Sequence, residues 1–540
     1  MQKVLTADQM RTVDRLTTER YGIPSIVLME NAAHAVARVI TDKLGGSVRD
    51  RRIVFFCGPG NNGGDGAALA RILWTQGANC FVSLLGTVSE TKGDARINFE
   101  ALKKFSDSER TNGPNENCLF LSEGSDLSGL DEIHQNDDVV VDALFGTGLS
   151  RPITGAVGNF IERVTRQRNR FKQLFVSIDI PSGLDSDKAE IIGPVFPADC
   201  TVTFTAPKAA NVILPTARNN GELTVANIGS PPELIEDQTS QLFLAEQDDA
   251  ARWLRNTRFT NDSYKNKRGH ALVMAGSESY SGAAVLAGNA AMRSGVGLVT
   301  LAVPSTILSE VAARALPDLI VRPFEDGGEI DFAADAILIG CGLDANNTAN
   351  EAMFRKIVEE RTTPVIVDAG ALWYLNPERG ENHPVGETPP PLLGKEGSQR
   401  ELILTPHEGE FLRLLGTDDK IAINDRVAAV RQYAVANNVI LVLKGERVLI
   451  GAPDGRVVVN PTGNSGLGKA GNGDTLSGIL AGFVAQAAGM NIDIFETVVA
   501  AVYVAGTAGD IAEKKYGKRV MTASDVRECL TEAFDGLAGN

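Results

Sequence analysis

The chain has 540 residues, more than one ordinary hydrophobic core organises, so we expect two domains of roughly 200–300 residues each. It carries 52 Lys and Arg against 68 Asp and Glu, which gives a formal net charge of −16. A general nucleic-acid-binding protein would present a basic face, so this balance argues against nucleic acid as a partner. A phosphate-bearing ligand is not excluded, because backbone amides bind phosphate whatever the net charge.

The cysteines and the apolar runs indicate in which cellular compartment the protein is expected. The 6 cysteines are scattered and include no C-x-x-C pair, so neither a zinc site nor a disulfide framework is indicated. Residues 1–20 lack the apolar core of a signal peptide. No uninterrupted apolar run reaches the ~18 residues of a membrane span. We therefore expect a cytoplasmic protein with no membrane partner.

The amino-terminal half predicts alternating helices, strands and glycine turns. Residues 7–41 carry apolar residues at helical spacing, interrupted by Gly22-Ile23-Pro24. Strands are expected at 52–58, 80–86, 137–146, 173–183 and 199–207, with a helix at 66–77 and helical stretches between the first three strands. This order implies right-handed crossovers and a mostly parallel sheet. The 55 glycines and an aromatic content of only 6% suit such a fold.

The pattern lapses between residues 229 and 250, where a Pro pair and acidic residues predict an interdomain linker. We therefore divide the chain into a first domain at 1–230, a linker at 231–250 and a second domain at 251–540. Residues 376–401 are rich in Pro, Gly and Glu and predict a surface loop. In the second domain, strands are expected at 270–276, 297–303, 335–340, 364–370, 402–406, 439–445 and 457–460, with helices that include 282–295 and 474–489. Both domains are thus expected to be α/β, each a mostly parallel sheet flanked by helices.

A first glycine-rich loop, "GPGNNGGDGAALARIL" at 58–73, lies between a predicted strand and a predicted helix. Ligands of open parallel sheets bind at this edge, and glycines let the backbone approach a ligand and expose its amides. The G-x-G-x-x-G pattern of nicotinamide dehydrogenases is absent. Asp65 has two interpretations at this stage: a cap of the following helix, or a group that faces the ligand.

Other strand ends of the same sheet also carry polar side chains. Asp142 ends one predicted strand, and Asp179 and Ser182 end the next. Because the carboxyl ends of parallel strands share one edge, we expect these groups to converge. Asn62, Asp142 and Ser182 could supply oxygen ligands to a hard cation. Asp65 and Asp179 would then face an organic substrate, and three such aspartates favour a site over three separate turns.

The segments "GPGNNGGDGAALAR", "VDALFGTGLSRPITG", "IDIPSGLDSD" and "TFTAPK" resemble, in this order, the motifs of NAD(P)H-hydrate epimerases over roughly 1–230. That family interconverts the R and S hydrates of NADH and NADPH (NADHX and NADPHX). The resemblance implies a Rossmann-like domain with a potassium ion bound by Asn62, Asp142 and Ser182. It implies that the hydrate contacts Asn61, Asn62, Gly63, Gly64, Asp65, Gly146, Thr147, Gly148, Leu149, Ser150, Arg151, Pro152 and Asp179, and we expect Asp65 to be catalytic.

A second glycine-rich loop, "GNSGLGKAGNGDTLSG" at 463–478, nearly matches the phosphate-binding pattern G-x-x-x-x-G-K-[ST]. Ala470 stands where that pattern needs a hydroxyl, so we interpret the match as coincidence. Gly471-Asn472-Gly473-Asp474 opens a long apolar helix, whose free amides and dipole favour phosphate. Asp474 is either the N-cap or a base that takes a proton from an attacking hydroxyl. The glycines on both sides of Asn472 favour the base.

The G-x-G-D loop resembles that of ribokinase-like kinases. More closely, "VMAGSESYSGAAVLAGNAAMRSGVGLVTLAV", "TPHEGEF", "VLKG" and "NPTGNSGLGKAGNGDTLSG" resemble ADP- or ATP-dependent NAD(P)H-hydrate dehydratases over roughly 250–535. The resemblance implies that Ala283, Gly342, His407 and Asp474 contact the hydrate, and that Lys444, Gly445, Glu446, Arg447, Val448 and Gly473 contact the nucleotide. For His407, a structural role at a helix start stays open. The sequence departs from the pattern at Asn472, at Cys341, where proline is common, and in the Pro-rich insertion.

Together the resemblances imply a bifunctional repair enzyme. The second domain would phosphorylate the added hydroxyl of the S hydrate with ADP, and elimination would restore NAD(P)H with release of AMP and phosphate. The first domain would recycle the R hydrate. Phosphoryl transfer needs charge neutralisation, so Mg²⁺ is expected in the second domain, and we also expect a homo-oligomer. A vitamin or sugar kinase fused to a nucleotide-binding module is the main alternative, and a non-enzymatic scaffold is a weaker one.

Overall fold

The structure is a computed structural model that describes residues 1–112, 117–124, 137–168, 172–325, 333–376 and 400–538. It divides into two compact units, Gln2–Ser240 and Gln241–Asn540, the second of which includes Met1. The division falls inside the segment predicted as a linker. That segment is not irregular, because it holds helix α7 (Pro232–Glu236), strand β9 (Leu242–Leu244) and the start of α8 (Gln247–Asn256). Most of the predicted surface loop, 377–399, lies outside the described residues.

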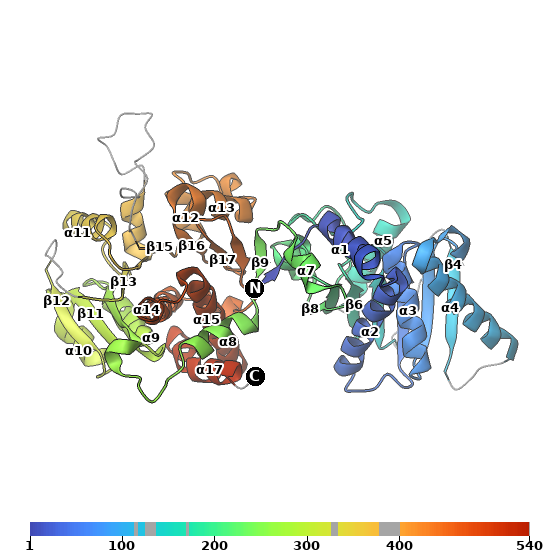
Figure 1. Ribbon diagram of the computed structural model, residues 1–540, viewed down its shortest axis with the longest axis horizontal. Helices are drawn as coiled ribbons and strands as arrows, with labels where there is room; N and C mark the ends of the chain where they lie inside the picture. Colours follow the sequence, from blue (N-terminus) through green and yellow to red (C-terminus); the bar gives the residue numbers. More distant parts are fainter. Residues whose placement is uncertain (113–116, 125–136, 169–171, 326–332, 377–399, 539–540) are drawn as a thin grey trace. The chain divides into compact units, whose positions relative to one another are not determined.

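The first unit is built on a 7-stranded sheet of order β4-β3-β2-β5-β6-β7-β8, in which every pair is parallel (Figure 1). This confirms the predicted α/β class. The strands are β2 (Arg52–Cys57), β3 (Asn79–Leu85), β4 (Leu119–Gly124), β5 (Val139–Ala143), β6 (Leu174–Ile178), β7 (Cys200–Phe204) and β8 (Glu222–Ala226). The sequence missed the two edge strands, β4 and β8, because their partly exposed residues form no continuous apolar run.

Helices cover both faces of this sheet. The helices of the unit are α1 (Ala7–Tyr21), α2 (Ser25–Lys43), α3 (Asn61–Thr75), α4 (Gly93–Asn112), α5 (Gly155–Arg168) and α6 (Ala209–Val212), besides α7, and a short strand β1 (Gln2–Lys3) precedes α1. Along β2 the side chains alternate: Ile53 and Phe55 pack with α2, α3 and α4, whereas Val54 and Phe56 pack with α5. Alternation between two helical layers fits the prediction of a mostly parallel sheet flanked by helices.

Helix α3 begins earlier than predicted, at Asn61 instead of Gly66, and its N-cap is Gly60. The interpretation of Asp65 as the N-cap is therefore wrong, because Asp65 lies inside the helix. Glycines let the helix pack closely against the strands. A Cβ on Gly63 would lie 1.8 Å from the carbonyl oxygen of Gly58, and one on Gly66 would lie 2.7 Å from the Cβ of Ala143. These glycines are thus required by packing.

The sheet of the second unit includes strands in the order β9-β18-β17-β16-β15-β14-β13-β10-β11-β12 (Figure 1). Neighbouring strands are parallel, except that β17 runs antiparallel to both β16 and β18. The strands are β10 (His270–Met274), β11 (Leu298–Pro304), β12 (Ile320–Phe324), β13 (Ala336–Ile339), β14 (Val365–Val367), β15 (Leu402–Leu404), β16 (Ile440–Leu443), β17 (Leu449–Gly451) and β18 (Val457–Val459). The sequence missed β9, which lies in the predicted linker, β12, which is largely exposed, and β17, which has only 3 residues.

The helices of this unit differ in whether they join the main hydrophobic core, to which α9, α14 and α15 contribute many residues and α11, α12 and α13 contribute none. They are α8, α9 (Ser281–Arg293), α10 (Leu308–Arg314), α11 (Thr348–Glu359), α12 (Glu408–Leu414), α13 (Arg426–Asn437), α14 (Asn472–Met490), α15 (Ile494–Tyr516), α16 (Ala523–Glu528) and α17 (Leu530–Ala538). A Cβ on Gly478 of α14 would lie 2.2 Å from the carbonyl oxygen of Ala287 in α9. This close approach fixes the position of α14, whose first turn carries Asp474.

Helix α15 is the one helix, among those of the described residues, that is long and apolar enough to cross a membrane. Its most apolar window has a mean hydropathy of 1.4, and 72% of that window is buried inside the protein. Val498, Ala501 and Ala508 of this helix lie in the hydrophobic core. Burial of this kind is what a core helix of a globular domain shows.

Candidate active sites

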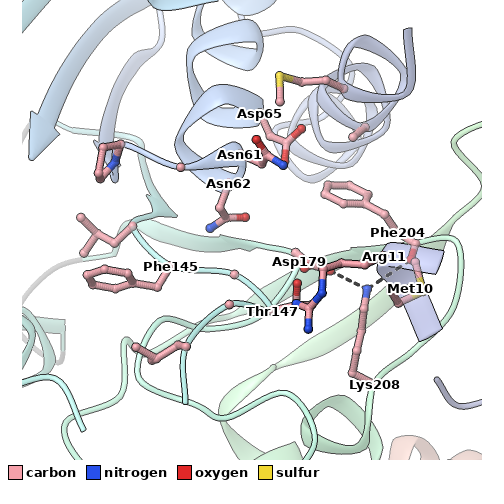
Figure 2. A pocket seen from close by; sticks show the side chains of 18 of the residues that line it. Met10, Arg11, Asn61, Asn62, Asp65, Phe145, Thr147, Asp179, Phe204 and Lys208 are labelled. Atoms are coloured by element: carbon pink, nitrogen blue, oxygen red, sulfur yellow. Dashed lines mark hydrogen bonds and ion pairs between the residues drawn. The ribbon is translucent and has the colours of Figure 1, made fainter. Parts of the chain in front are cut away.

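A cavity of about 1050 Å³ lies at the carboxyl ends of the strands in the first unit (Figure 2). The structure brings most of the predicted hydrate-binding residues together on its wall. The lining includes Asn61, Asn62, Asp65, Gly146, Thr147, Gly148, Leu149, Ser150, Arg151, Pro152 and Asp179. Gly63 and Gly64 are not part of the lining. Gly64 packs against α4, where a Cβ would lie 2.8 Å from the Cα of Ala95.

Asp65 projects from α3 into this cavity as a strongly perturbed acid (Figure 2). Burial raises its pKa well above the usual range, and the negative charges of Asp179 and Asp14 raise it further. A carboxyl in this environment favours the protonated form. It can therefore hold a proton at a pH where an exposed aspartate has lost it.

Asp179 lies across the cavity in an ion pair with Lys208 (Figure 2). The Lys208 side chain is 1% exposed, and its ammonium donates to Asp179 Oδ1 at 2.6 Å, to Thr203 Oγ1 at 2.8 Å and to the Phe204 carbonyl at 3.2 Å. Asp179 has a φ of 65°, in the left-handed region that a non-glycine residue rarely adopts. The surrounding hydrogen bonds hold this conformation and keep the carboxylate at the cavity wall.

The three residues predicted to bind a hard cation lie around the loop that follows β5. Asp142 accepts hydrogen bonds from Ser182 Oγ at 2.6 Å, from Ser182 N at 2.7 Å and from Ser177 Oγ at 3.0 Å. Burial raises the pKa of Asp142 to about 6, against the opposing effect of these bonds. The side chain of Asn62 contacts the same loop, because a Cβ on Gly146 would lie 3.3 Å from its Oδ1.

The donor set at this place is amide, hydroxyl and carboxylate. The buried Nδ2 of Asn62 has no hydrogen-bond partner within the described residues. The described part of the chain contains no group of three or more His, Cys, Asp or Glu side chains that could hold a metal ion. The oxygen donors of these three side chains, with no sulfur or imidazole among them, fit a weakly held hard cation rather than a transition metal.

In the second unit, a cavity of about 440 Å³ lies over the carboxyl ends of β13 and β14. Ala283, Gly342 and Asp474 line it, as three of the four predicted hydrate contacts. The N-cap of α14 is Gly471, with a φ of 87°, so the interpretation of Asp474 as the N-cap is wrong. Burial raises the pKa of Asp474 to about 6, and the nearby Asp368 carboxylate adds to the shift.

His407, the fourth predicted contact, is the N-cap of α12. Its Nδ1 accepts from the amides of Gly409 and Glu410 at 3.0 and 3.2 Å, and Glu410 Oε2 accepts from the His407 amide at 2.7 Å. His407 is not part of the cavity lining, whereas Glu410 is. The structure therefore shows the helix-start role that the sequence left open, and contact with the hydrate stays a prediction.

The predicted nucleotide-binding residues also lie outside this cavity lining. Lys444, at the end of β16, donates to Asp368 Oδ1 at 2.7 Å. A Cβ on Gly473 would lie 3.5 Å from Lys444 Nζ, so the backbone of the second glycine loop passes close to the lysine. Gly445, Glu446, Arg447 and Val448 follow Lys444 in the connection to β17. Binding of a nucleotide by these residues stays a prediction.

Comparisons with known proteins cover both units. Residues 25–210 match the family described as YjeF-related protein N-terminus, and residues 271–532 match the NAD(P)H-hydrate dehydratase family. The bifunctional NAD(P)H-hydrate repair enzyme Nnr of Moorella thermoacetica is 36% identical over 99% of this chain and 97% of its own length. The enzyme of the same name from Thermofilum pendens is 33% identical over 99% of this chain and 97% of its own length.

The chain belongs to the bifunctional NAD(P)H-hydrate repair enzymes. Among solved structures, it is similar to the ADP/ATP-dependent NAD(P)H-hydrate dehydratase from Bacillus subtilis co-crystallised with ATP and Mg²⁺. That similarity has 27% identity and a TM-score of 0.47 and covers 55% of this chain and 98% of the other. In this repair enzyme, each family match falls within one unit and includes that unit's cavity-lining aspartate, Asp65 or Asp474.

Sequence reasoning missed three charged residues of the repair enzyme. Asp14 of α1 lines the first cavity, its Oδ1 has no hydrogen-bond partner within the described residues, and burial raises its pKa to about 6. Lys208 stands in the quoted "TFTAPK", where a lysine after a buried strand was an available signal. Asp368 ends β14, and although burial would raise its pKa, Lys444 outweighs that effect and lowers it. Asp14 offered no signal, because a polar residue is ordinary at its place in an amphipathic helix.

Proposed function

We propose that the first unit epimerises the R and S hydrates of NADH and NADPH, and that the second unit dehydrates the S hydrate to NAD(P)H with ADP. The observation that carries this proposal is the pair of strand-end cavities, each lined by a half-buried aspartate, Asp65 or Asp474. The names of the relatives that match nearly the whole chain support it. They also favour it over the alternative of a vitamin or sugar kinase. A cytoplasmic location and a homo-oligomer remain parts of the proposal.

Epimerisation requires that the carbon–oxygen bond at the hydroxyl-bearing carbon breaks, with release of water, and that water then adds to the other face and returns its proton to the acid. The departing group needs a proton, and the developing positive charge needs a nearby anion. Asp65, held in the acid form by burial, is placed to donate the proton. Asp179 is held at the opposite wall by Lys208 and supplies the negative charge.

Potassium would be held by Asn62, Asp142 and Ser182, whose oxygen-rich set fits this ion. When bound, it would supply positive charge beside the loop that follows β5. The ion links the unit's stability to salt composition, because a ligand that binds only the folded state stabilises it.

Replacing choline chloride by KCl at constant ionic strength is therefore expected to raise the melting temperature of the first unit. We expect a shift of about 2–4 °C, which corresponds to about 1 kcal/mol for a domain of this size. Scanning calorimetry of the full chain measures it. Asp142→Asn is expected to lose the response, whereas Asp65→Asn keeps it. A response that survives in Asp142→Asn would place the ion elsewhere.

Dehydration begins with transfer of a phosphoryl group to the added hydroxyl. Asp474 lies at the cavity and takes the hydroxyl proton as the oxygen attacks. The backbone amides in the first turn of α14 would bind the phosphate charge that develops. Mg²⁺ would enter with the nucleotide phosphates, and the Glu410 carboxylate at the cavity wall would help to hold it while Asp474 serves as the base. Incubating the protein with purified S- or R-NADHX and following dihydronicotinamide absorbance tests both reactions.

ADP is expected to be the better co-substrate than ATP. Backbone amides and one lysine can bind a polyphosphate but do not distinguish two phosphates from three. The preference for ADP therefore rests on resemblance to fused two-domain repair enzymes. Asn472, beside the loop amides, removes the hydroxyl common in that family. Initial rates of S-NADHX dehydration with each nucleotide, purified free of the other, decide the matter. A kcat/KM for ATP equal to that for ADP would contradict the expectation and leave the dehydratase assignment in place.

A further inference from the structure

A second cavity of the carboxy-terminal unit has no part in the chemistry described so far. It has a volume of about 660 Å³ and lies at the carboxyl ends of β10, β11, β12 and β13. It shares Tyr280, Leu343 and Ala345 with the cavity of Asp474, so the two are neighbours along one wall. Ligand sites in proteins commonly occupy about 300–1,000 Å³, so the 440 Å³ around Asp474 is small for a whole dinucleotide.

The topology decides which part of which ligand can reach this second cavity. In the sheet, β16 and the predicted nucleotide-binding residues lie on one side of β14, and β10, β11 and β12 lie on the other. The reacting carbon of the hydrate would face Asp474, and the phosphoryl donor would lie on the β16 side. The other half of the hydrate would then point toward β10, β11 and β12. That half is the adenosine end of the dinucleotide.

The lining of this cavity is acidic and carries an unsatisfied polar group. Glu278, Glu325 and Asp344 line it, and its described lining residues include no lysine, arginine or histidine. Asn350, also in the lining, is 3% exposed, and its Oδ1 has no hydrogen-bond partner within the described chain. A buried amide left unpaired is costly, so this group is expected to meet a polar ligand atom.

Resting on the proposed function, we infer that this cavity binds the adenosine end of the hydrated dinucleotide and favours NADHX over NADPHX. Carboxylates accept hydrogen bonds from ribose hydroxyls, as an acidic residue does in dinucleotide-binding folds. The additional phosphate of NADPHX brings negative charge to a wall that already carries Glu278 and Glu325. The two carboxylates are exposed, so solvent screens the repulsion and makes it sensitive to salt.

The test compares kcat/KM for S-NADHX and S-NADPHX with the full chain and ADP. At about 10 mM ionic strength we expect a three- to tenfold preference for S-NADHX, and we expect it to shrink at about 1 M, where charges are screened within ~3 Å. The double variant Glu278→Gln/Glu325→Gln should raise kcat/KM for S-NADPHX toward that for S-NADHX. Glu360→Gln, an exposed acid of the same unit outside the lining, is the matched control and should keep the preference.

Asn350→Leu provides a second measurement. Removing a buried amide oxygen that has no donor is not expected to lower the melting temperature, but it should raise KM for both hydrates about tenfold while kcat stays near wild type. Equal kcat/KM for both hydrates in the wild type, or unchanged KM in Asn350→Leu, would overturn this inference alone. If neither hydrate is dehydrated at all, the proposed function fails together with the inference.

Discussion

Asp474→Asn is expected to lower kcat for dehydration of the S hydrate by at least ~10²-fold, the usual cost of removing a general base. The change keeps the shape of the side chain and removes its ability to take a proton. The N-cap of α14 is Gly471, so Asp474 has no capping bond to lose. Nucleotide binding, followed by calorimetric titration with ADP, should stay largely intact. Turnover of the S hydrate by Asp474→Asn near the wild-type rate would contradict the assignment of Asp474 as the base.

The pH dependence of dehydration is a second measurement that tests the role of Asp474 as the base. Because burial raises the pKa of Asp474 to about 6, its carboxylate form is lost as the pH falls below about 6. We expect kcat for dehydration to fall over that range and to level off above it. The raised pKa also means that stability falls as the pH rises from the usual aspartate value of 3.8 to about 6, because the folded state then binds more protons than the unfolded state. Asp474→Asn should therefore melt no lower than the wild type at pH 7.

The double variant Asp65→Asn/Asp142→Ala is expected to lose epimerisation by at least ~10²-fold and to keep dehydration of the S hydrate at an undiminished rate. The physical reason is that each unit contains its own sheet and its own cavity. With a mixture of hydrates and excess ADP, the reaction should proceed until the S hydrate is consumed. It should then stall on the R hydrate, apart from slow spontaneous epimerisation.

Asp142 is fully buried and hydrogen-bonded, so this variant needs a check of its fold. Asp65→Asn alone serves this purpose, because it removes the proton donor and leaves the Asp142 hydrogen bonds in place. Asp474→Asn is the reciprocal control and should still equilibrate the R and S hydrates, which chiral chromatography resolves. Loss of S-hydrate turnover in Asp65→Asn would show that the two sites are not independent.

The alternation of apolar runs and glycine turns determined the α/β class and most of the strands. Buried strands such as β14 and β16 have every residue buried, and their sequences are continuous apolar runs. The motifs also placed Asp65, Asp179 and Asp474 at strand ends or helix starts, and the structure places all three at cavity walls. Edge strands escaped prediction, because exposed residues interrupt the apolar pattern.

Only the tertiary structure decided which charged groups meet. Lys208 pairs with Asp179 across 29 positions of the sequence, and Lys444 pairs with Asp368 across 76. Neither ion pair can be recognised from a periodic pattern in the sequence, because the order of strands in the sheet brings the partners together. Asp14 reaches its cavity from α1, a helix whose sequence shows only amphipathic spacing. Local sequence thus determines where helices and strands form, while the pKa of each buried carboxyl depends on neighbours that only the folded chain supplies.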